Sequence, residues 1–319
     1  MLLDVLLLMA GFIVLIKGAD FLVDGASSLA KKYSISPLII GLTIVSFGTS
    51  APEIAVNIFS SINGKSEALF GNILGSNMFN LMFILGLSGI IYPLAVQRNT
   101  IRYEVPYSLF AIILMFILAN DVLLFGAEKN VISTTDSLIL LGCFGLFLYY
   151  IYLSMRKKGV NDDRSIKEFT ITKSILMSIG GIVMLVGGGK LTLDSALNLA
   201  HMFGLSEKLI GLTILAVGTS LPELATSVIA AIKKNTDIAI GNIVGSNIFN
   251  IFLVLGVSGV VSPIDFNPVM NLDMSVLAIG TLILLVSMFT MTPAKLDRWE
   301  AFVLLVAYIA YTFYLIIRN

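Results

Sequence analysis

Charged residues, cysteine and histidine are scarce in this sequence of 319 residues. Only 13% of the residues are charged, whereas a soluble domain carries about 25%. Lys and Arg balance Asp and Glu at 20 each, and the formal net charge of zero gives no bulk attraction to nucleic acid. Cys143 and His201 are the only residues of their types. Disulfides are therefore excluded, and a transition-metal site of thiolate or imidazole ligands is not expected.

Apolar residues dominate the chain, with 57% hydrophobic residues and a mean hydropathy of +0.96. A membrane-spanning helix needs about 20 predominantly apolar residues, and the sequence predicts ten such spans. The N-terminal stretch has no basic segment and no small-residue cleavage site, so we interpret it as a retained first span and not as a signal peptide. The predicted spans are 3–29, 36–60, 68–92, 104–119, 134–155, 174–200, 207–232, 238–261, 273–290 and 298–317.

Two motifs occur twice, each time 170 residues apart. GLTIVSFGTSAPE at Gly41–Glu53 returns as GLTILAVGTSLPE at Gly211–Glu223, with 9 of 13 positions identical. GNILGSNMFN at Gly71–Asn80 returns as GNIVGSNIFN at Gly241–Asn250, with 8 of 10 identical. Five spans per half is an odd number, so the second half must enter the membrane from the opposite side. The sequence therefore predicts an all-α integral membrane protein of ten helices, built as two inverted-topology five-helix repeats.

The polar segment 156–173 divides the chain into the predicted repeats 1–155 and 174–319. If the N-terminus lies outside the cell, fourteen Lys and Arg residues fall on the inner side and five on the outer side, and Lys17 lies inside a span. This excess follows the positive-inside rule. We therefore expect a multi-pass protein of the cell membrane, with the linker loop in the cytoplasm and both termini extracellular.

Glu53 and Glu223 place carboxylates inside apolar spans. A charge near the bilayer centre costs at least ~2.5 kcal/mol, so such residues normally face a cavity and serve a pathway. Pro52 and Pro222 precede them, and a helical proline frees the carbonyl four residues back, which must then find water, protein or a cation. The alternative is a protonated structural carboxylic acid that hydrogen-bonds between helices. The duplication of the motif, among hydroxyl residues, favours an ion pathway.

In the second motif, Ser76 and Asn80 lie four residues apart and so share one helix face, as do Ser246 and Asn250. Helix packing alone could explain the motif glycines, but not the amides, because neutral polar groups in lipid need partners. The two motifs supply carboxylate, hydroxyl, amide and carbonyl oxygens, which suit Ca²⁺, Na⁺ or Mg²⁺. Mg²⁺ fits less well because it prefers strict octahedral geometry. Two carboxylates predict competition between one Ca²⁺ and several Na⁺ ions.

At the GTSxPE and GNIxGSNxxN pairs the chain resembles the cation/calcium exchanger superfamily, and within it the prokaryotic sodium/calcium exchangers. The resemblance covers both halves and implies a core of spans 2, 3, 7 and 8, across which spans 1 and 6 slide. It further implies an antiporter of Na⁺ and Ca²⁺ that needs no cofactor and works as a monomer in the lipid bilayer. The implied ligands are Glu53 and Glu223 for both ions; the carbonyls of Thr49 and Thr219 for Ca²⁺; an inner Na⁺ site of the Ser46 carbonyl, Thr49, Glu53 and Ser76; an outer one of the Ala216 carbonyl, Thr219, Glu223 and Ser246; Asn80 and Asn250 in the middle; and the hydroxyls of Ser50 and Ser220.

Departures from two related branches favour sodium coupling. Potassium-dependent exchangers carry Asp where this chain has Asn250, so a third carboxylate is missing and K⁺ cotransport is not expected. The proton-coupled branch carries an Asn in the stretch that Thr49 and Ser50 occupy here. Na⁺/Ca²⁺ antiport is therefore the expected function, and Ca²⁺/H⁺ antiport is the alternative. An intramembrane hydrolase lacks a second catalytic signature, so no enzyme activity is expected. Stoichiometric coupled flux would exclude a channel.

Overall fold

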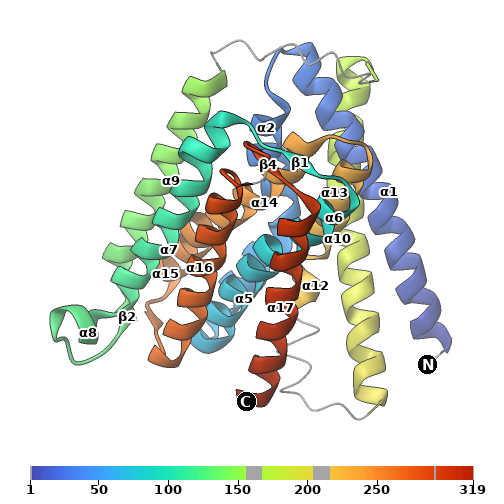
Figure 1. Ribbon diagram of the computed structural model, residues 1–319. Helices are drawn as coiled ribbons and strands as arrows, with labels where there is room; N and C mark the ends of the chain where they lie inside the picture. Colours follow the sequence, from blue (N-terminus) through green and yellow to red (C-terminus); the bar gives the residue numbers. More distant parts are fainter. Residues whose placement is uncertain (1, 156–166, 204–215, 291, 319) are drawn as a thin grey trace.

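The computed structural model describes residues 2–155, 167–203, 216–290 and 292–318 (Figure 1). The first half of the chain contains α1 (Leu2–Lys32), α2 (Pro37–Ile40), η1 (Gly41–Val45), α3 (Ser46–Thr49), α4 (Ala51–Ile62), α5 (Ser66–Met78), η2 (Phe79–Ile84), α6 (Leu85–Ile91), η3 (Thr100–Glu104), α7 (Val105–Ala119), α8 (Asp121–Phe125) and α9 (Thr134–Met155). The second half contains α10 (Ile171–Met202), α12 (Ala216–Thr219), α13 (Leu221–Ile232), α14 (Thr236–Ile248), η5 (Phe249–Leu255), α15 (Gly256–Val261), η6 (Pro268–Met270), α16 (Asn271–Ser287) and α17 (Arg298–Arg318). Of the η elements, η6 is a 3₁₀-helix and the others are π-helical turns.

Eight helices of the described chain are long and apolar enough to cross a membrane, and the bent pair Pro37–Thr49 and Ala51–Ile62 makes a ninth. The all-helical membrane fold is thus confirmed. The fourth span begins at Thr100 and not at 104, because the π-helical turn η3 continues directly into α7. The predicted seventh span, 207–232, lies partly outside the described residues, which contain only α12 and α13 of it.

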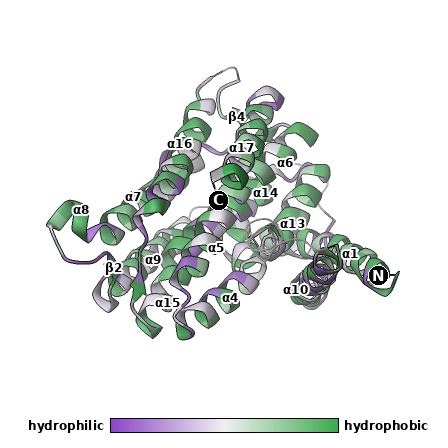
Figure 2. Ribbon diagram, turned by 90° about the horizontal axis from the view of Figure 1, so that it is seen from below, coloured by the Kyte–Doolittle hydropathy of each residue, from purple (hydrophilic) through white to green (hydrophobic). Residues whose placement is uncertain are grey.

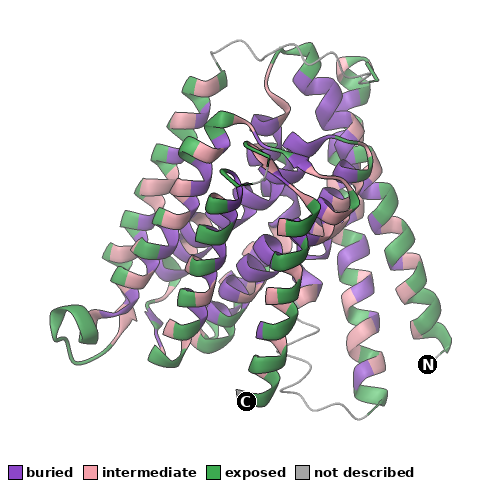
Figure 3. Ribbon diagram, viewed as in Figure 1, coloured by how far each residue is buried: buried purple, intermediate pink, exposed green. Residues whose placement is uncertain are grey.

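The most deeply buried helices lie in the middle of the molecule (Figure 3). In Thr236–Val261, 94% of the most apolar stretch is buried, and in Ser66–Ile91 78% is buried. The other membrane-length helices are buried over 33% or less of that stretch, and exposed apolar side chains cover their outer faces. This distribution fits helices that face lipid around a protein core.

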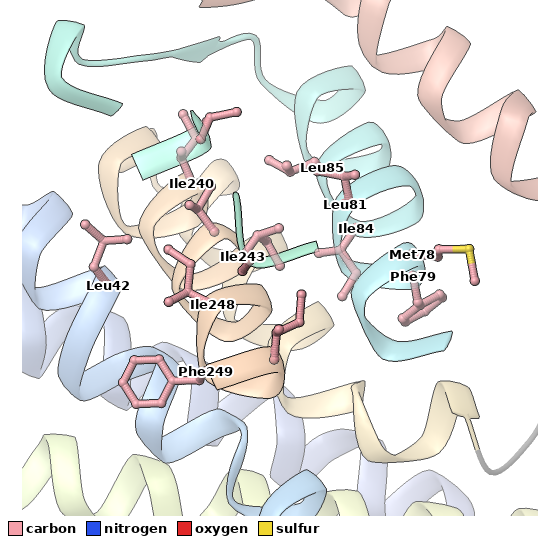
Figure 4. Packing of buried hydrophobic residues seen from close by; sticks show 14 of the residues in the cluster. Leu42, Met78, Phe79, Leu81, Ile84, Leu85, Ile240, Ile243, Ile248 and Phe249 are labelled. Atoms are coloured by element: carbon pink, nitrogen blue, oxygen red, sulfur yellow. The ribbon is translucent and has the colours of Figure 1, made fainter. Parts of the chain in front are cut away.

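Close packing holds the central helices together. Figure 4 shows Ile243 and Ile248 of α14 between Leu42 of η1 and Ile84 of η2, all of them buried. Lipid tails are as apolar as these side chains, so the contacts stabilise the fold through tight packing and not through removal from water. The glycines of the second copy of the GNI motif, Gly241 and Gly245, permit this packing: a Cβ on Gly241 would lie 2.7 Å from the Leu38 carbonyl oxygen.

Helices α1 and α10 lie side by side at one edge of the molecule (Figure 2). They are antiparallel and meet through small residues spaced seven apart, at Gly11, Gly18 and Gly25 on α1 and Ser174, Gly181 and Gly188 on α10. A Cβ on Gly181 would lie 2.7 Å from both the Gly18 carbonyl oxygen and the Leu22 nitrogen. Two full helical turns separate successive members, so the small residues form one seam along each helix.

Two antiparallel strand pairs join loops that are distant in the sequence. β1 (Leu94–Ala95) pairs with β4 (Lys295–Leu296), and β2 (Val131–Ile132) pairs with β3 (Ile264–Asp265). The charge count places the loops of β1 and β4 on the inner side and those of β2 and β3 on the outer side. Each pair therefore joins loops that the sequence assigns to the same face, and the two termini lie together at one end (Figure 1).

The seam between α1 and α10 is sensitive to a single methyl group. Gly181→Ala is expected to lower the free energy of unfolding by about 1–3 kcal/mol, because its Cβ meets backbone atoms that cannot move alone. The neighbouring Gly180 has open space at its Cβ position and is the matched control. Thermal unfolding of the detergent-solubilised variants measures both effects. Equal unfolding midpoints for the two variants would show that the seam contributes nothing.

Candidate functional site

Both glutamates stand on the first turn of a helix that follows a break. α3 and α4 meet at Ser50 with a bend of 49° between the helices on either side. Ser50 has φ −80° and ψ 8°, and Ser220, between α12 and α13, has φ −90° and ψ 11°. A proline in the first turn of α4 and of α13 explains the break, since it cannot donate a helical hydrogen bond. The breaks place Glu53 and Glu223 at helix N-termini, where the helix dipole favours negative charge.

Each glutamate is held by the serine of the other half. Ser50 Oγ donates to Glu223 Oε1 at 2.9 Å, and Ser220 Oγ donates to Glu53 Oε1 at 3.1 Å. Each serine lies one helical turn before the glutamate of its own half, so the two crossed bonds gather both carboxylates into one cluster. All four side chains are buried. The structure thus gives the two motif serines a positioning contact that the sequence alone did not predict.

The motif threonines cross between the halves in the same way. Thr49 Oγ1 donates to Asn242 Oδ1 at 3.0 Å, and Thr219 Oγ1 donates to Asn72 Oδ1 at 3.1 Å. Neither asparagine was among the predicted site residues. Both are the second residue of the GNI motif and are buried at matching positions, so duplication of a polar residue inside a span was the available signal.

Four amides join the two copies of the second motif. Asn80 Nδ2 donates to Asn247 Oδ1 at 3.2 Å, and Asn250 Nδ2 donates to Asn77 Oδ1 at 3.0 Å. In addition, Asn247 Nδ2 donates to the Asn77 carbonyl at 3.2 Å, and Asn77 Nδ2 donates to the Asn247 carbonyl at 3.5 Å. The four amides thus find hydrogen-bond partners in each other, whereas the Oδ1 atoms of Asn80 and Asn250 have none.

The two halves differ at the serines of the second motif. Ser246 Oγ donates to Glu223 Oε1 at 3.3 Å and lies 3.0 Å from Ser50 Oγ. Ser76, its counterpart, is equally buried but its hydroxyl has no hydrogen bond. The structure therefore brings together the predicted pair of Glu223 and Ser246 directly, while no hydrogen bond links Ser76 to Glu53.

The residues whose carbonyls begin the two predicted sodium sites, Ser46 and Ala216, differ in type. The Ser46 carbonyl accepts the Ser50 N–H at 2.9 Å, and the Ser46 hydroxyl donates to the Gly41 carbonyl at 2.6 Å. The same hydroxyl lies 3.0 Å from the Asn242 carbonyl, so the side chain packs against α14. Ala216 begins α12, one turn before Thr219.

Five buried oxygen atoms of the predicted ligands have no hydrogen-bond partner: Glu53 Oε2, Glu223 Oε2, Ser76 Oγ, Asn80 Oδ1 and Asn250 Oδ1. Within the described ranges, no Lys, Arg or His forms an ion pair with either glutamate. A buried, unpaired carboxylate is strongly unfavourable. The described residues also contain no group of three or more His, Cys, Asp and Glu that could hold a metal. The arrangement suits hard cations that supply the missing positive charge.

Comparison with known proteins identifies the family of this chain. A family model described as sodium/calcium exchanger protein matches residues 3–153 and 173–317. The putative antiporter CaxA of Alkalimonas amylolytica is 36% identical over 325 residues, which cover 99% of each chain. The sodium/calcium exchanger MaX1 of Methanosarcina acetivorans is 31% identical, with 96% of each chain covered.

A solved structure of the sodium-calcium exchanger NCX_Mj has the same fold. It superposes with a TM-score of 0.82 at 30% sequence identity, over 98% of this chain and 99% of that one. The family match covers both halves, including all four copies of the paired motifs. This chain belongs to the sodium/calcium exchanger family of membrane transporters.

Proposed function

We propose that this protein is a sodium/calcium antiporter, which exchanges Na⁺ for Ca²⁺ across the cell membrane by alternating access. The observation that carries the proposal is the buried pair of Glu53 and Glu223. Serines of the opposite half hold Oε1 of each carboxylate, and Oε2 of each has no partner. Two ionised carboxylates with unpartnered oxygens need positive charge beside them, and one Ca²⁺ or several Na⁺ ions can supply it.

The proposed ligands follow from this arrangement. Ca²⁺ accepts about six to eight oxygens in flexible geometry, and both glutamates with the carbonyls of Thr49 and Thr219 supply its protein ligands. The Na⁺ ligands are the Ser46 carbonyl, Thr49, Glu53 and Ser76 toward the inner side, and the Ala216 carbonyl, Thr219, Glu223 and Ser246 toward the outer side. Asn80 and Asn250 line the middle with their unpartnered Oδ1 atoms, and Ser50 and Ser220 hold the carboxylates in place.

We propose that the membrane topology follows the sequence duplication. Ten spans form two inverted repeats, 1–155 and 174–319, with the 156–173 linker in the cytoplasm, both termini outside and one chain as the working unit. The 170-residue register of the crossed contacts supports this, because Ser50 with Glu223 and Ser220 with Glu53 are equivalent pairs. The strand pairs β1–β4 and β2–β3 support the assignment of loops to two faces.

The driving ion can be identified with the wild-type protein in liposomes. An outward Na⁺ gradient is expected to drive isotopic Ca²⁺ uptake, whereas K⁺ and pH gradients imposed separately have little effect. Protons can also neutralise buried carboxylates, so Ca²⁺/H⁺ antiport is the second candidate. Uptake that follows the pH gradient and ignores the Na⁺ gradient would replace the proposal with that one. Uptake without any coupled counter-ion would indicate a channel.

Each central carboxylate should be indispensable. Glu53→Gln and Glu223→Gln are each expected to lower Ca²⁺ flux at least about a hundredfold, because loss of one buried charge of a coordinating set costs roughly 3 kcal/mol or more. Glu67→Gln is the matched control, since Glu67 is exposed and bonds to Asn267. Flux in the same liposome assay measures the effect. Comparable flux in either central variant and in Glu67→Gln would remove the basis of the proposal.

Ser76 separates the Na⁺ role from the Ca²⁺ role. Its hydroxyl has no hydrogen bond, so Ser76→Ala leaves no protein group without a partner. The variant is expected to need several times more Na⁺ to displace Ca²⁺, while Ca²⁺ binding without Na⁺ and thermal stability stay unchanged. Isothermal titration with Ca²⁺ at increasing Na⁺ concentrations measures both quantities. An equal loss of Ca²⁺ and Na⁺ affinity would contradict a role confined to Na⁺.

A further inference from the structure

A cavity of 390 Å³ lies between α7 and α9, outside the central ion site. Its walls come from η3 and the first turns of α7 on one side and from the last three turns of α9 on the other. The 93–99 connection precedes η3, and the 156–173 linker follows α9. The charge count places both segments in the cytoplasm. The cavity therefore lies at the depth of the cytoplasmic leaflet.

Glu104 is the unusual residue of this cavity. Its side chain is only 2% exposed although it lies within a membrane-length helix, Thr100–Ala119. Its Oε1 accepts a hydrogen bond from the Tyr150 hydroxyl, and its Oε2 has no partner. The central site does not use this carboxylate. An ionisable group inside a membrane that lines a cavity indicates a ligand of opposite charge.

A second carboxylate and tyrosine pair provides a comparison. Tyr311 of α17 donates to Asp273 of α16 at 2.6 Å, also in a buried position. Neither residue lines the cavity between α7 and α9. A hydrogen bond between a tyrosine and a buried carboxylate can therefore serve only to join two helices, and alone it does not indicate a ligand site. What distinguishes Glu104 is the cavity, its unpartnered oxygen and a cation, Arg102, in the same cavity lining.

The remaining walls combine one cation with aromatic rings. Arg102 lines the cavity and is exposed, with its guanidinium carbon 5.8 Å from the centre of the Tyr103 ring. Tyr107, Phe147 and Tyr150 add aromatic surface deeper inside. Aromatic faces attract ammonium groups, and a guanidinium matches phosphate geometry. The lining thus offers one site for a cation, one for an anion and an apolar body.

The cavity opens toward lipid. Leu146 on α9 is 64% exposed and Phe110 on α7 is 42% exposed, and both line the opening. Helices α7 and α9 lie at the outer edge of the molecule (Figure 1). A ligand that reaches Glu104 and Arg102 together by this route is amphipathic and zwitterionic.

We propose that this cavity binds the headgroup of an ethanolamine phospholipid from the cytoplasmic leaflet, with its ammonium at Glu104, its phosphate at Arg102 and an acyl chain along Phe110 and Leu146. A primary ammonium can donate to the buried, unpartnered Oε2 of Glu104, whereas the trimethylammonium of a choline lipid has no N–H group to donate. A glycerol headgroup brings no positive charge for Glu104. The proposal does not depend on which ions the central site transports.

Native mass spectrometry of the full-length protein in mild detergent tests this directly. Equal concentrations of dioleoyl phosphatidylethanolamine, phosphatidylcholine and phosphatidylglycerol are added, and bound lipid is counted. The ethanolamine lipid is expected to bind about tenfold more tightly, as a hydrogen bond to a charged group implies. Glu104→Gln is expected to lose that preference, and the matched control Asp273→Asn to keep it.

A second variant keeps the test decisive if Glu104→Gln does not fold. Leu146→Trp enlarges an exposed side chain at the opening and leaves Glu104 and Tyr150 untouched. Because the larger side chain narrows the opening, this variant is expected to bind the ethanolamine lipid about tenfold more weakly, which matches the loss expected for Glu104→Gln. Its unfolding midpoint should stay unchanged. Equal binding of the three lipids to the wild type overturns the proposal. So does undiminished binding of the ethanolamine lipid to Leu146→Trp.

Discussion

The structure depends on two carboxylates that the protein buries with no basic partner among the described residues. Glu53 and Glu223 lie in the centre of the helix bundle, and no positive side chain of the described chain reaches them. An arginine at this place would compensate the charge permanently and close the site. The fold instead supplies partial compensation, from helix N-termini and hydroxyl donors, and leaves one oxygen of each carboxylate open. Burial makes the two carboxylates unfavourable when they are ionised, and the same burial strengthens their attraction for a cation.

Crossed contacts make the two halves depend on each other. Ser50 holds Glu223 and Ser220 holds Glu53, so neither half positions its own carboxylate alone. The amides of the second motif are paired in the same manner. Because the contacts of the motif threonines, of Ser50 and Ser220 and of the amides each have an equivalent 170 residues away, the centre of the protein is nearly symmetric in its chemistry. Ser76, without the bond that Ser246 makes, and Ser46, whose counterpart is Ala216, are exceptions. They make the two ends of the site chemically different.

Duplication made much of this site predictable from the sequence. A carboxylate after a proline, repeated inside two apolar spans, indicated both the helix breaks and Glu53 with Glu223. Hydrophobic periodicity and motif spacing describe each helix by itself, however, and do not set how one half is placed against the other. The crossing of Ser50 to Glu223 and the roles of Asn72 and Asn242 follow from that placement and were not predicted. Glu104 was not recognised because its partner, Tyr150, lies on another span and belongs to no motif.

The glycine seam between α1 and α10 fixes these helices lengthwise. Small residues recur every seven positions on both helices, so the next matching register lies about 10.5 Å away at a rise of ~1.5 Å per residue. A smaller shift of one helix along the other would press side chains into backbone. The two helices, one from each half, therefore behave as a single rod. If that rod gates the site, one part serves both entrances, and a movement that uncovers one of them covers the other.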